Sequence, residues 1–305
     1  MLNTLYKVFT RILLNRLQPL AEAILGEQQA GFRAGRSTND KIFTLRVLYE
    51  KYWEYDKNLY NLFIDYRQAY DSIYRPSLWH ILREYNIPNK LISLIKACYV
   101  NSKCSVKVGK RKTDYFEVKS GLRQGCMLSP LLFNLVLEKA IQTTAHIAQG
   151  AIISNNKISM LAYADDVVIL SETERGLEEL STPFLEMSKR VGLECNVGKT
   201  KLMLLSRRDR IDDNVNIGDM EVEGVQSFKY LGSTVTSNNL MDNEIIERIG
   251  VGNRCVFALG RVLKSQIISR RTKSRIYNII IRPTVLYGCE TWTLTKERMR
   301  KLEFF

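Results

Sequence analysis

The sequence has little of what builds thiolate metal sites or secreted proteins. It contains two histidines and six scattered cysteines, and no two cysteines are separated by only two residues, so a structural zinc site is not expected. Its first residues include Lys7, Arg11 and Arg16 and lack a secretory apolar core. Isolated cysteines in such a chain fit a reducing compartment. We therefore expect an intracellular protein, nuclear or cytoplasmic and not secreted.

Long apolar runs, repeats and low-complexity linkers are also missing. The longest apolar run, residues 127–137, contains Ser129, Pro130 and Asn134 and is too short to span a bilayer. No membrane partner is therefore expected. With 305 residues, of which 45% are hydrophobic and 25% charged, the chain is long enough to bury a core in two or three packed subdomains.

Basic residues are in clear surplus. The chain has 45 Lys and Arg against 32 Asp and Glu, a formal charge of +13 and a pI near 9.4. A surplus of this size favours a polyanionic partner such as nucleic acid. Two clusters, Arg207 to Arg210 and Arg261 to Arg275, are candidates for tracking phosphate groups.

Apolar periodicity and breakers predict a mixture of helices and strands. Helices are expected at residues 4–20, 39–55, 76–100 with a break near 88, from about 130, at 173–190 and after about 239. Strands are expected at residues 60–64, 202–205, 217–222 and 228–231, as a pair at 105–108 and 115–119 around a basic turn, and as a hairpin at 158–170.

Three aspartates interrupt or end apolar strands. Asp65 follows the run 62–64, and Asp165 and Asp166 divide the run 160–170. Charged groups are rare in such runs unless they are paired or bind metal. A solvated hairpin turn would explain the Asp-Asp pair alone. A third acid at a neighbouring strand end favours a site for two Mg²⁺ ions, because phosphoryl transfer uses hard oxygen ligands and ions about 3.5–4 Å apart.

Six segments resemble, in the expected order, the motifs of reverse transcriptases from non-LTR (LINE-type) retrotransposons. They are residues 29–38 (QAGFRAGRST), 62–71 (LFIDYRQAYD), 121–134 (GLRQGCMLSPLLFN), 163–166 (YADD), 192–200 (GLECNVGKT) and 228–232 (FKYLG). The tail 287–294 (YGCETWTL) resembles the region after the polymerase core of such elements. One four-residue box recurs by chance, whereas ordered motifs along nearly the whole chain are specific.

The resemblance implies an α+β right-hand polymerase. Residues 1–235 would form partial fingers and a palm with an antiparallel sheet packed on helices, and residues 236–305 a truncated, helical thumb-like or connection region. Residues 3–17 resemble the segment just after the first fingers motif, so we expect a fragment without the basic fingertip hairpin.

The resemblance also assigns the metal site. Asp65, Asp165 and Asp166 would hold two Mg²⁺ ions, for which Mn²⁺ can substitute, and the carbonyl of Phe63 or Ile64 would add an oxygen. The implied reaction is attack of a primer 3′-hydroxyl on the α-phosphate of a dNTP with release of pyrophosphate. An RNA template and a DNA primer or duplex are the implied partners, and the oligomeric state is not defined by the sequence.

Substrate roles follow in the same way. Tyr70 would exclude a 2′-hydroxyl beneath the incoming sugar, although a plain core aromatic fits the local sequence too. The amides of Gln68 and Ala69 would hold phosphate oxygens. Gln124 and Gly125 would border the nucleotide, or simply form a turn before a helix.

Two basic residues complete the implied set. Arg33, in the fingers motif, would contact substrate. Lys199 would protonate or neutralise the departing pyrophosphate, and a solvated surface lysine is the equally weighted alternative.

Two other functions are compatible with parts of the sequence. One is a catalytically weak or inactive fragment that binds RNA as a maturase-like remnant. The other is a different palm-type enzyme, such as a nucleotide cyclase, which would not explain the motif around Gln124. The three intact aspartates favour the polymerase.

Overall fold

A six-stranded sheet lies at the centre of the computed structural model, which describes residues 3–153, 156–211 and 213–303. Its strand order is β11-β12-β10-β1-β9-β8. The strands are β1 (Leu59–Ile64), β8 (Met160–Tyr163), β9 (Asp166–Ser171), β10 (Lys201–Leu205), β11 (Asn214–Ile217) and β12 (Met220–Gly224). Neighbours are antiparallel except β10 and β12, which are parallel. The expected α+β class and antiparallel sheet are confirmed, apart from that one pair.

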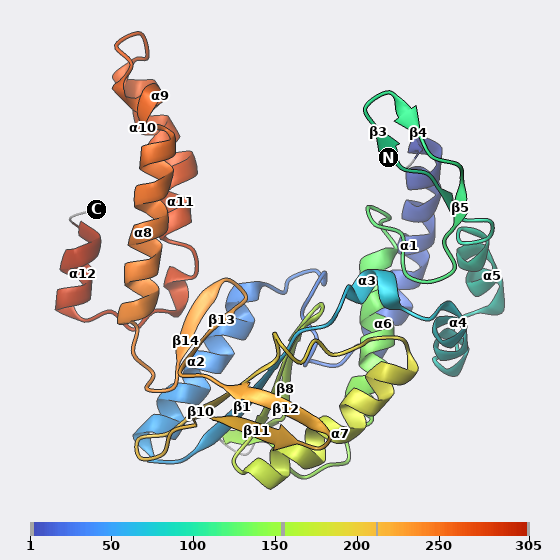
Figure 1. Cartoon of the computed structure of the whole chain (residues 1–305), viewed down its shortest axis with the longest axis horizontal. Coiled ribbons are helices and arrows are strands. Elements are labelled where there is room, and N and C mark those ends of the chain that lie inside the picture. The colour runs from blue at the N-terminus through green and yellow to red at the C-terminus, as the bar shows by residue number, and fades with distance from the viewer. Residues whose placement is uncertain (1–2, 154–155, 212, 304–305) are drawn as a thin grey trace.

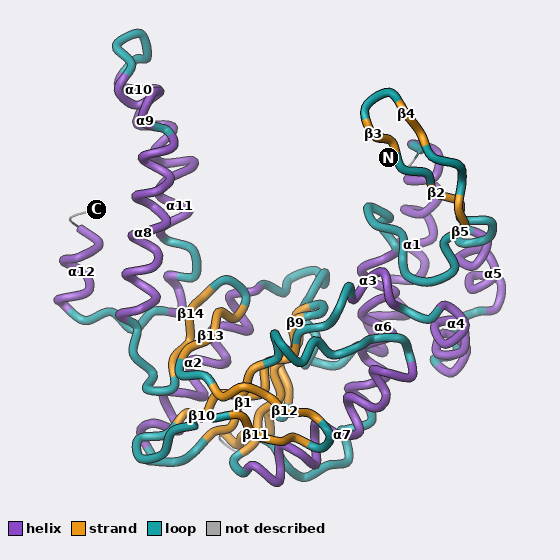
Figure 2. Tube along the Cα trace, in the orientation of Figure 1, coloured by secondary structure: helices purple, strands orange, loops and turns teal. Residues whose placement is uncertain are grey.

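Helices form two arms that rise on either side of the sheet (Figures 1 and 2). The first arm contains α1 (Thr4–Ile24), α3 (Ala69–Ser72), α4 (Arg75–Glu84), α5 (Asn89–Ala97) and α6 (Ser129–Gln142). The second arm contains α8 (Asp242–Ala258), α9 (Gly260–Lys264), α10 (Arg270–Ile276), η1 (Tyr277–Ile281), α11 (Arg282–Val285), η2 (Cys289–Thr291) and α12 (Lys296–Glu303). Two further helices, α2 (Thr38–Glu54) and α7 (Glu174–Arg190), pack on the sheet.

Helix boundaries follow the local signals in the sequence. Ser37 caps α2 in a capping box with Asp40, each side chain bonding the other residue's main-chain amide. Pro130 occupies the first turn of α6, where its missing amide costs nothing. Pro88 separates α4 from α5. The predicted helices at these positions are therefore confirmed.

Two strand predictions are corrected. Residues 217–222 are not one strand but the turn of the β11–β12 hairpin, where Ile217 pairs with Met220 and Gly218 has φ +57°. Residues 105–108 do not pair with 115–119. Instead, β3 (Lys107–Val108) pairs with β4 (Arg111–Lys112), and β2 (Lys103–Cys104) pairs with β5 (Phe116–Glu117). The basic turn is thus itself part of a hairpin at the tip of the first arm (Figure 1).

The remaining strands form two small hairpins. One joins β6 (Ala151–Ile153) to β7 (Asn156–Ile158). The other joins β13 (Ser227–Tyr230) to β14 (Ser233–Thr236) and contains the FKYLG segment. Leu231 and Gly232 both have positive φ, as a two-residue hairpin turn of type I′ requires.

Both faces of the sheet are buried, because side chains of β1 alternate between two apolar clusters. Leu62 and Ile64 belong to the larger cluster, which includes α1, α4, α5, α6 and α7. Leu59 and Phe63 belong to the second, which includes α2 and the β13–β14 hairpin. This packing accounts for the apolar runs 62–64 in β1 and 167–170 in β9, where a sheet with one face open to solvent would show alternation.

The longest apolar run forms most of the buried face of α6, which packs against α1, α4 and α7. Over the residues that the structure covers, no helix combines the length and apolar character needed to cross a membrane. All six cysteines are free thiols.

Candidate active site

Asp165 lies in the tight turn between β8 and β9, and Asp166 is the first residue of β9. Tyr163 pairs with Asp166 across the hairpin, so Ala164 and Asp165 are the two turn residues. Ala164 has φ +56°, a conformation that L-residues other than glycine rarely adopt. The predicted hairpin with the acids at its tip is confirmed.

Asp65 comes to the same place from the neighbouring strand. The antiparallel register pairs Ile64, the last residue of β1, with Val167, so Asp65, the residue after β1, lies beside the start of β9, where Asp166 is located. The main chain of Asp65 is fixed by two contacts: its amide donates to Thr200 Oγ1 at 3.3 Å, and its carbonyl accepts from Asn196 N at 2.7 Å.

The three carboxyl groups interact electrostatically. Burial raises the pKa of Asp165, and the charge of Asp65 raises it further. Burial, then Asp165, then Asp65 raise the pKa of Asp166 to about 6. Asp166 is exposed, so solvent screens part of this repulsion. A bound divalent cation would relieve it.

The acids form an open site and not a closed cage. Among residues 3–153, 156–211 and 213–303, no three His, Cys, Asp or Glu side chains are gathered closely enough to hold one ion by themselves. This fits Mg²⁺, which commonly binds one or two carboxylates and completes its shell with water and substrate phosphates.

A pocket of about 320 Å³ opens beside the acids. Asp65, Asp166 and Lys199 line it together with Phe228 and Tyr230 of the β13–β14 hairpin. The rings of Phe63 and Phe228 stack 4.2 Å apart, which ties the hairpin to the strand that carries Asp65. Ile64 also lines this pocket and pairs with β9 alone, whereas Phe63 pairs with both neighbouring strands.

A second pocket, of about 400 Å³, contains three of the predicted nucleotide contacts: Tyr70, Gln124 and Gly125. The ring of Tyr70 stacks on Phe133 at 4.6 Å. Burial raises the pKa of Tyr70, and its hydroxyl, though buried, has no hydrogen-bond partner within the described chain. A polar group from a ligand would satisfy it.

Gly125 and Gln124 differ in their freedom to meet a ligand. Gly125 has φ +78° and no atom within 4 Å of where a Cβ would be, so its surroundings are open. The Gln124 amide instead donates to the Asp71 carboxylate at 3.0 and 3.2 Å. A nucleotide would have to replace that contact.

A third pocket, of about 970 Å³, is basic on balance, with one acid, Glu194, among the described residues that line it. Gln68 and Lys199 line it, as do Arg67, Lys189 and Arg190. None of these four cations has an ion-pair partner in the described part of the chain. Gln68, at φ +46°, turns the chain immediately before Ala69 begins α3, and the first amides of a helix lack acceptors within it.

The guanidinium of Arg33, predicted to contact substrate, is engaged by other groups of the protein. Its guanidinium donates to Gly26 O at 2.6 Å and Gln29 O at 2.9 Å and pairs with Glu22 at 2.8 Å, and its side chain is 6% exposed. Because these protein groups engage the N–H donors of Arg33, the arrangement favours a loop-stabilising role over a substrate contact.

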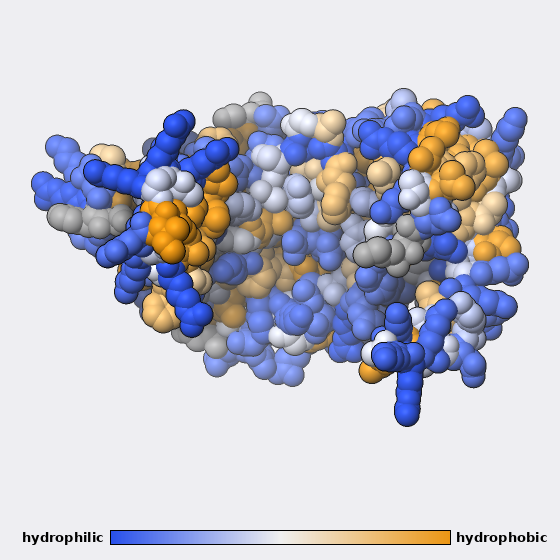
Figure 3. Space-filling view, turned by 90° about the horizontal axis from the view of Figure 1, so that it is seen from above, coloured by the Kyte–Doolittle hydropathy of each residue, from blue (hydrophilic) through white to orange (hydrophobic). Residues whose placement is uncertain are grey.

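The two basic clusters lie in different places. The Arg207–Arg210 cluster follows β10, which runs away from Asp65, and Arg208 pairs with Asp56 at the far end of the sheet. This position does not favour the predicted phosphate track. The Arg261–Arg275 cluster lies at the top of the second arm, beside Ile267, which is 97% exposed. Seen from above, the surface is hollowed between the two arms (Figure 3).

Sequence reasoning missed Gln29 as part of the site. Its side chain is 0% exposed and bonds the main chain of Ala164 in the acid-bearing turn. The QAGFRAGRST segment was recognised, yet a glutamine in a polar, glycine-punctuated loop carries no local signal of burial.

Comparison with known proteins agrees with the motifs. Residues 1–235 match the family described as "Reverse transcriptase (RNA-dependent DNA polymerase)". A Nasonia vitripennis protein named "Retrovirus-related Pol polyprotein from type-1 retrotransposable element R2" is 28% identical over 239 residues, 75% of this chain and 23% of that protein. The "Probable RNA-directed DNA polymerase from transposon X-element" of Drosophila melanogaster is 28% identical over 311 positions, 96% of this chain and 32% of that protein.

Solved structures support the fold. Apo telomerase from Candida tropicalis, truncated from its C-terminal domain, superposes with a TM-score of 0.55 at 15% identity, over 77% of this chain and 45% of that one. The chain spans about a quarter to a third of the length of the curated relatives above. Since the family match covers well over half of its residues, the chain belongs to the reverse transcriptase family.

Proposed function

We propose that the chain is the catalytic core of an RNA-directed DNA polymerase from a non-LTR retrotransposon. The observation that carries the proposal is the strand register that brings Asp65 beside the Asp165–Asp166 turn. The related retrotransposon polymerases support the template-directed reaction. No observation favours the inactive RNA-binding remnant.

Asp65, Asp165 and Asp166 would hold two Mg²⁺ ions, with Mn²⁺ as a substitute. Bound there, the ions would stabilise the attacking and leaving oxygens of an in-line displacement. The residues fit such ions because their mutual repulsion needs a counter-charge. Both candidate carbonyls belong to residues that line the pocket beside the acids. Ile64 is the better candidate because it lies at the strand end and pairs with β9 alone, whereas Phe63 pairs with both neighbouring strands.

The remaining groups would bind the dNTP around this centre. Tyr70 and Gly125 would border the sugar and base in the 400 Å³ pocket, with Gln124 joining them after leaving Asp71. The amides of Gln68 and Ala69 would hold phosphate oxygens. Lys199 lines both the acid-side and the basic pocket, a position suited to the charge of departing pyrophosphate.

The nucleic acid would lie between the arms. An RNA template paired with a DNA primer carries phosphates that the +13 chain attracts, and the second arm presents the Arg261–Arg275 cluster. We keep residues 1–235 as fingers and palm and 236–305 as the thumb-like region, a division supported by the loop between β14 and α8.

Primer extension on an RNA template tests the proposal. With Mg²⁺ and dNTPs, the wild type should extend the primer and Asp165→Ala should not. Asp219→Ala, an exposed acid in the β11–β12 turn, is the matched control and should extend normally. Extension by Asp165→Ala, or RNA binding with no extension by the wild type, would contradict the proposal.

Tyr70→Ala should admit ribonucleotides, and unchanged rejection of ribonucleotides would refute the sugar-selecting role of Tyr70.

A further inference from the structure

The segment containing Gln29 acts as a short extra strand beside β8. Gln29 forms a parallel bridge with Ala162. On either side of it, Ala162 N donates to Gln28 O at 2.9 Å and Ala30 N donates to Ala162 O at 2.9 Å. The main chain thus carries Gln29 to the end of the strand that leads into the acid-bearing turn.

The Gln29 side chain continues this ladder onto the turn itself. Its Oε1 accepts from Ala164 N at 2.9 Å, and its Nε2 donates to Ala164 O at 3.2 Å. Oε1 also accepts from Gly31 N at 2.8 Å. One buried amide therefore satisfies three main-chain groups and holds Ala164 from both of its peptide bonds.

The hydrogen bonds from Gln29 fix the backbone at Ala164, the residue of the turn with positive φ. A positive φ is unfavourable for an L-residue, and such strain persists only where the surrounding structure fixes it. Asp165 follows directly and Asp166 closes the hairpin. A small relaxation at Ala164 would therefore move both carboxyl groups.

We call the three hydrogen bonds of the Gln29 side chain the Gln29 clamp. A second set of contacts, made by Gly31, fixes the position of the clamp against the turn. A Cβ at Gly31 would lie 2.2 Å from Ala164 N and 2.9 Å from its Cα, so the loop contacts the turn directly. Asn134 of α6, itself 0% exposed, donates to Gly31 O at 2.6 Å. The helix that follows the Gln124–Gly125 segment is thereby connected through one glycine to the acid-bearing turn.

We propose that Gln29 is a positioning residue of the active site, which sets where the Asp165 and Asp166 carboxylates meet the divalent cations. The inference rests on the proposed function, since it assumes that those acids bind metal. Metal sites require ligands held to within about 0.5 Å. Loss of a group that orients the ligands typically lowers metal affinity or activity roughly 10- to 100-fold.

The test compares Gln29→Met, which keeps the length and removes the amide, with Gln28→Met, the same change at a neighbour whose side chain takes no part in the clamp. Mn²⁺ binding is measured by electron paramagnetic resonance with a dNTP and a dideoxy-terminated DNA primer on RNA, so that no turnover occurs. The Mg²⁺ concentration for half-maximal extension and the KM for primer–template are measured with extendable primer.

We expect the Mn²⁺ dissociation constant and the Mg²⁺ requirement to rise roughly 10- to 100-fold in Gln29→Met, with KM for primer–template unchanged and Gln28→Met like the wild type. Wild-type metal values in a folded Gln29→Met would overturn the inference. If that variant does not fold, Gly31→Ala decides, because it keeps the amide and pushes a methyl group into Ala164. Wild-type metal affinity there would equally overturn it.

Failure of the proposed function is distinguished by the Asp165→Ala extension assay. Extension without that acid would reject the polymerase mechanism, whatever Gln29 does. Mn²⁺ binding without turnover reports on the clamp even when extension fails.

Discussion

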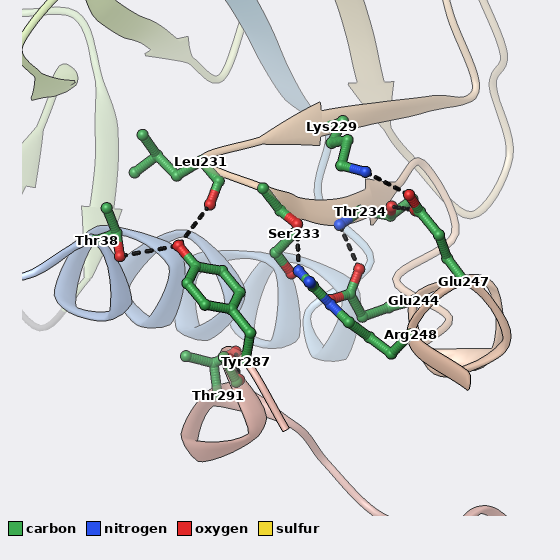
Figure 4. A network of polar contacts seen from close by, with 12 residues as sticks. Thr38, Lys229, Leu231, Ser233, Thr234, Glu244, Glu247, Arg248, Tyr287 and Thr291 are labelled. Atoms are coloured by element: carbon green, nitrogen blue, oxygen red, sulfur yellow. Dashed lines mark hydrogen bonds and ion pairs between the residues drawn. The ribbon is translucent and has the colours of Figure 1, made fainter. Parts of the chain in front are cut away.

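Two glutamates one turn apart on α8 give a direct test of how the second arm is held to the sheet. Glu244 and Glu247 both contact Thr234 of β14: Glu244 accepts from its amide at 2.5 Å, and Glu247 from its hydroxyl at 2.5 Å (Figure 4). Each also pairs with a cation, Glu244 with Arg248 at 2.8 Å and Glu247 with Lys229. They differ in burial.

Burial sets the expected magnitudes. The Glu244 and Arg248 side chains are 1% and 12% exposed, and removing one member of such a pair leaves an uncompensated charge that costs about 3–5 kcal/mol. The Glu247 and Lys229 side chains are 36% and 56% exposed, where a pair contributes about 0–1 kcal/mol. Glu244→Ala should therefore destabilise far more than Glu247→Ala, and the change in helix propensity is the same in both.

The other contacts of Arg248 increase the expected destabilisation by Glu244→Ala, because they hold its guanidinium in place when the carboxylate is removed. Its guanidinium also donates to Gly232 O and lies over the Tyr287 ring at 4.8 Å. Arg46 of α2, whose pKa is lowered by burial and raised by Glu244, reaches Ser233 from the other side. Without Glu244, the buried Arg46 and the partly buried Arg248 would keep their charge and lose their shared anion.

Urea unfolding followed by circular dichroism measures the difference. With a slope of about 1–3 kcal/mol per molar urea, Glu244→Ala should lower the midpoint by roughly 1 M or more, and Glu247→Ala by a few tenths. Glu244→Gln, which keeps an acceptor for the Thr234 amide, should fall between them. Equal midpoint shifts for the two alanine variants would refute the reasoning that burial decides.

Three further predictions follow from the site. The folded-state pKa of Asp166, about 6 against an ordinary 3.8, means that the folded chain holds this proton more tightly. Without divalent cations, thermal stability should therefore fall as pH rises from about 4 through 6. Asp166→Asn should flatten that fall, and an unchanged profile would contradict the shift. Gly192→Ala should sharply lower the melting temperature, because its Cβ would lie 2.5 Å from Ser72 O. Gly109→Ala, at a position that also has positive φ but has open space around it, should cost only roughly 1–2 kcal/mol, and equal losses would count against crowding. Replacing Lys189 and Arg190 by Ala should weaken pyrophosphate inhibition roughly fivefold, for about 1 kcal/mol from two exposed cations. Unchanged inhibition would exclude the basic pocket as a pyrophosphate site.

Local signals were enough for elements whose chemistry is local. The Ser37–Asp40 capping box marks the start of α2, and unbroken apolar runs mark strands buried on both faces. The β11–β12 hairpin was missed although Gly218 and Asp219 are ordinary turn residues, because apolar residues on both sides of them suggested one continuous strand. The pairing of the four short strands β2, β3, β4 and β5 could not be predicted from the sequence. All their residues are exposed, so no buried face sets the register.

The same division holds at the site. The acids were found because a charge within an apolar run is unusual in itself. The Gln29 clamp was not, because its partners Ala164 and Asn134 are distant in sequence and contribute main-chain or ordinary amide groups. For Arg33, a basic residue in a loop, the sequence gives no sign that Glu22 and two carbonyls surround the guanidinium.

The double-sided burial of β1 and β9 restricts where chemistry can take place in this domain. Both strands have a partner along each edge and a layer of apolar side chains above and below. A polar side chain can thus reach water only where the strands stop. An acid that binds a ligand from solvent on β1 or β9 must therefore lie at a strand end. There, a shift of a single peptide would be enough to displace its carboxylate.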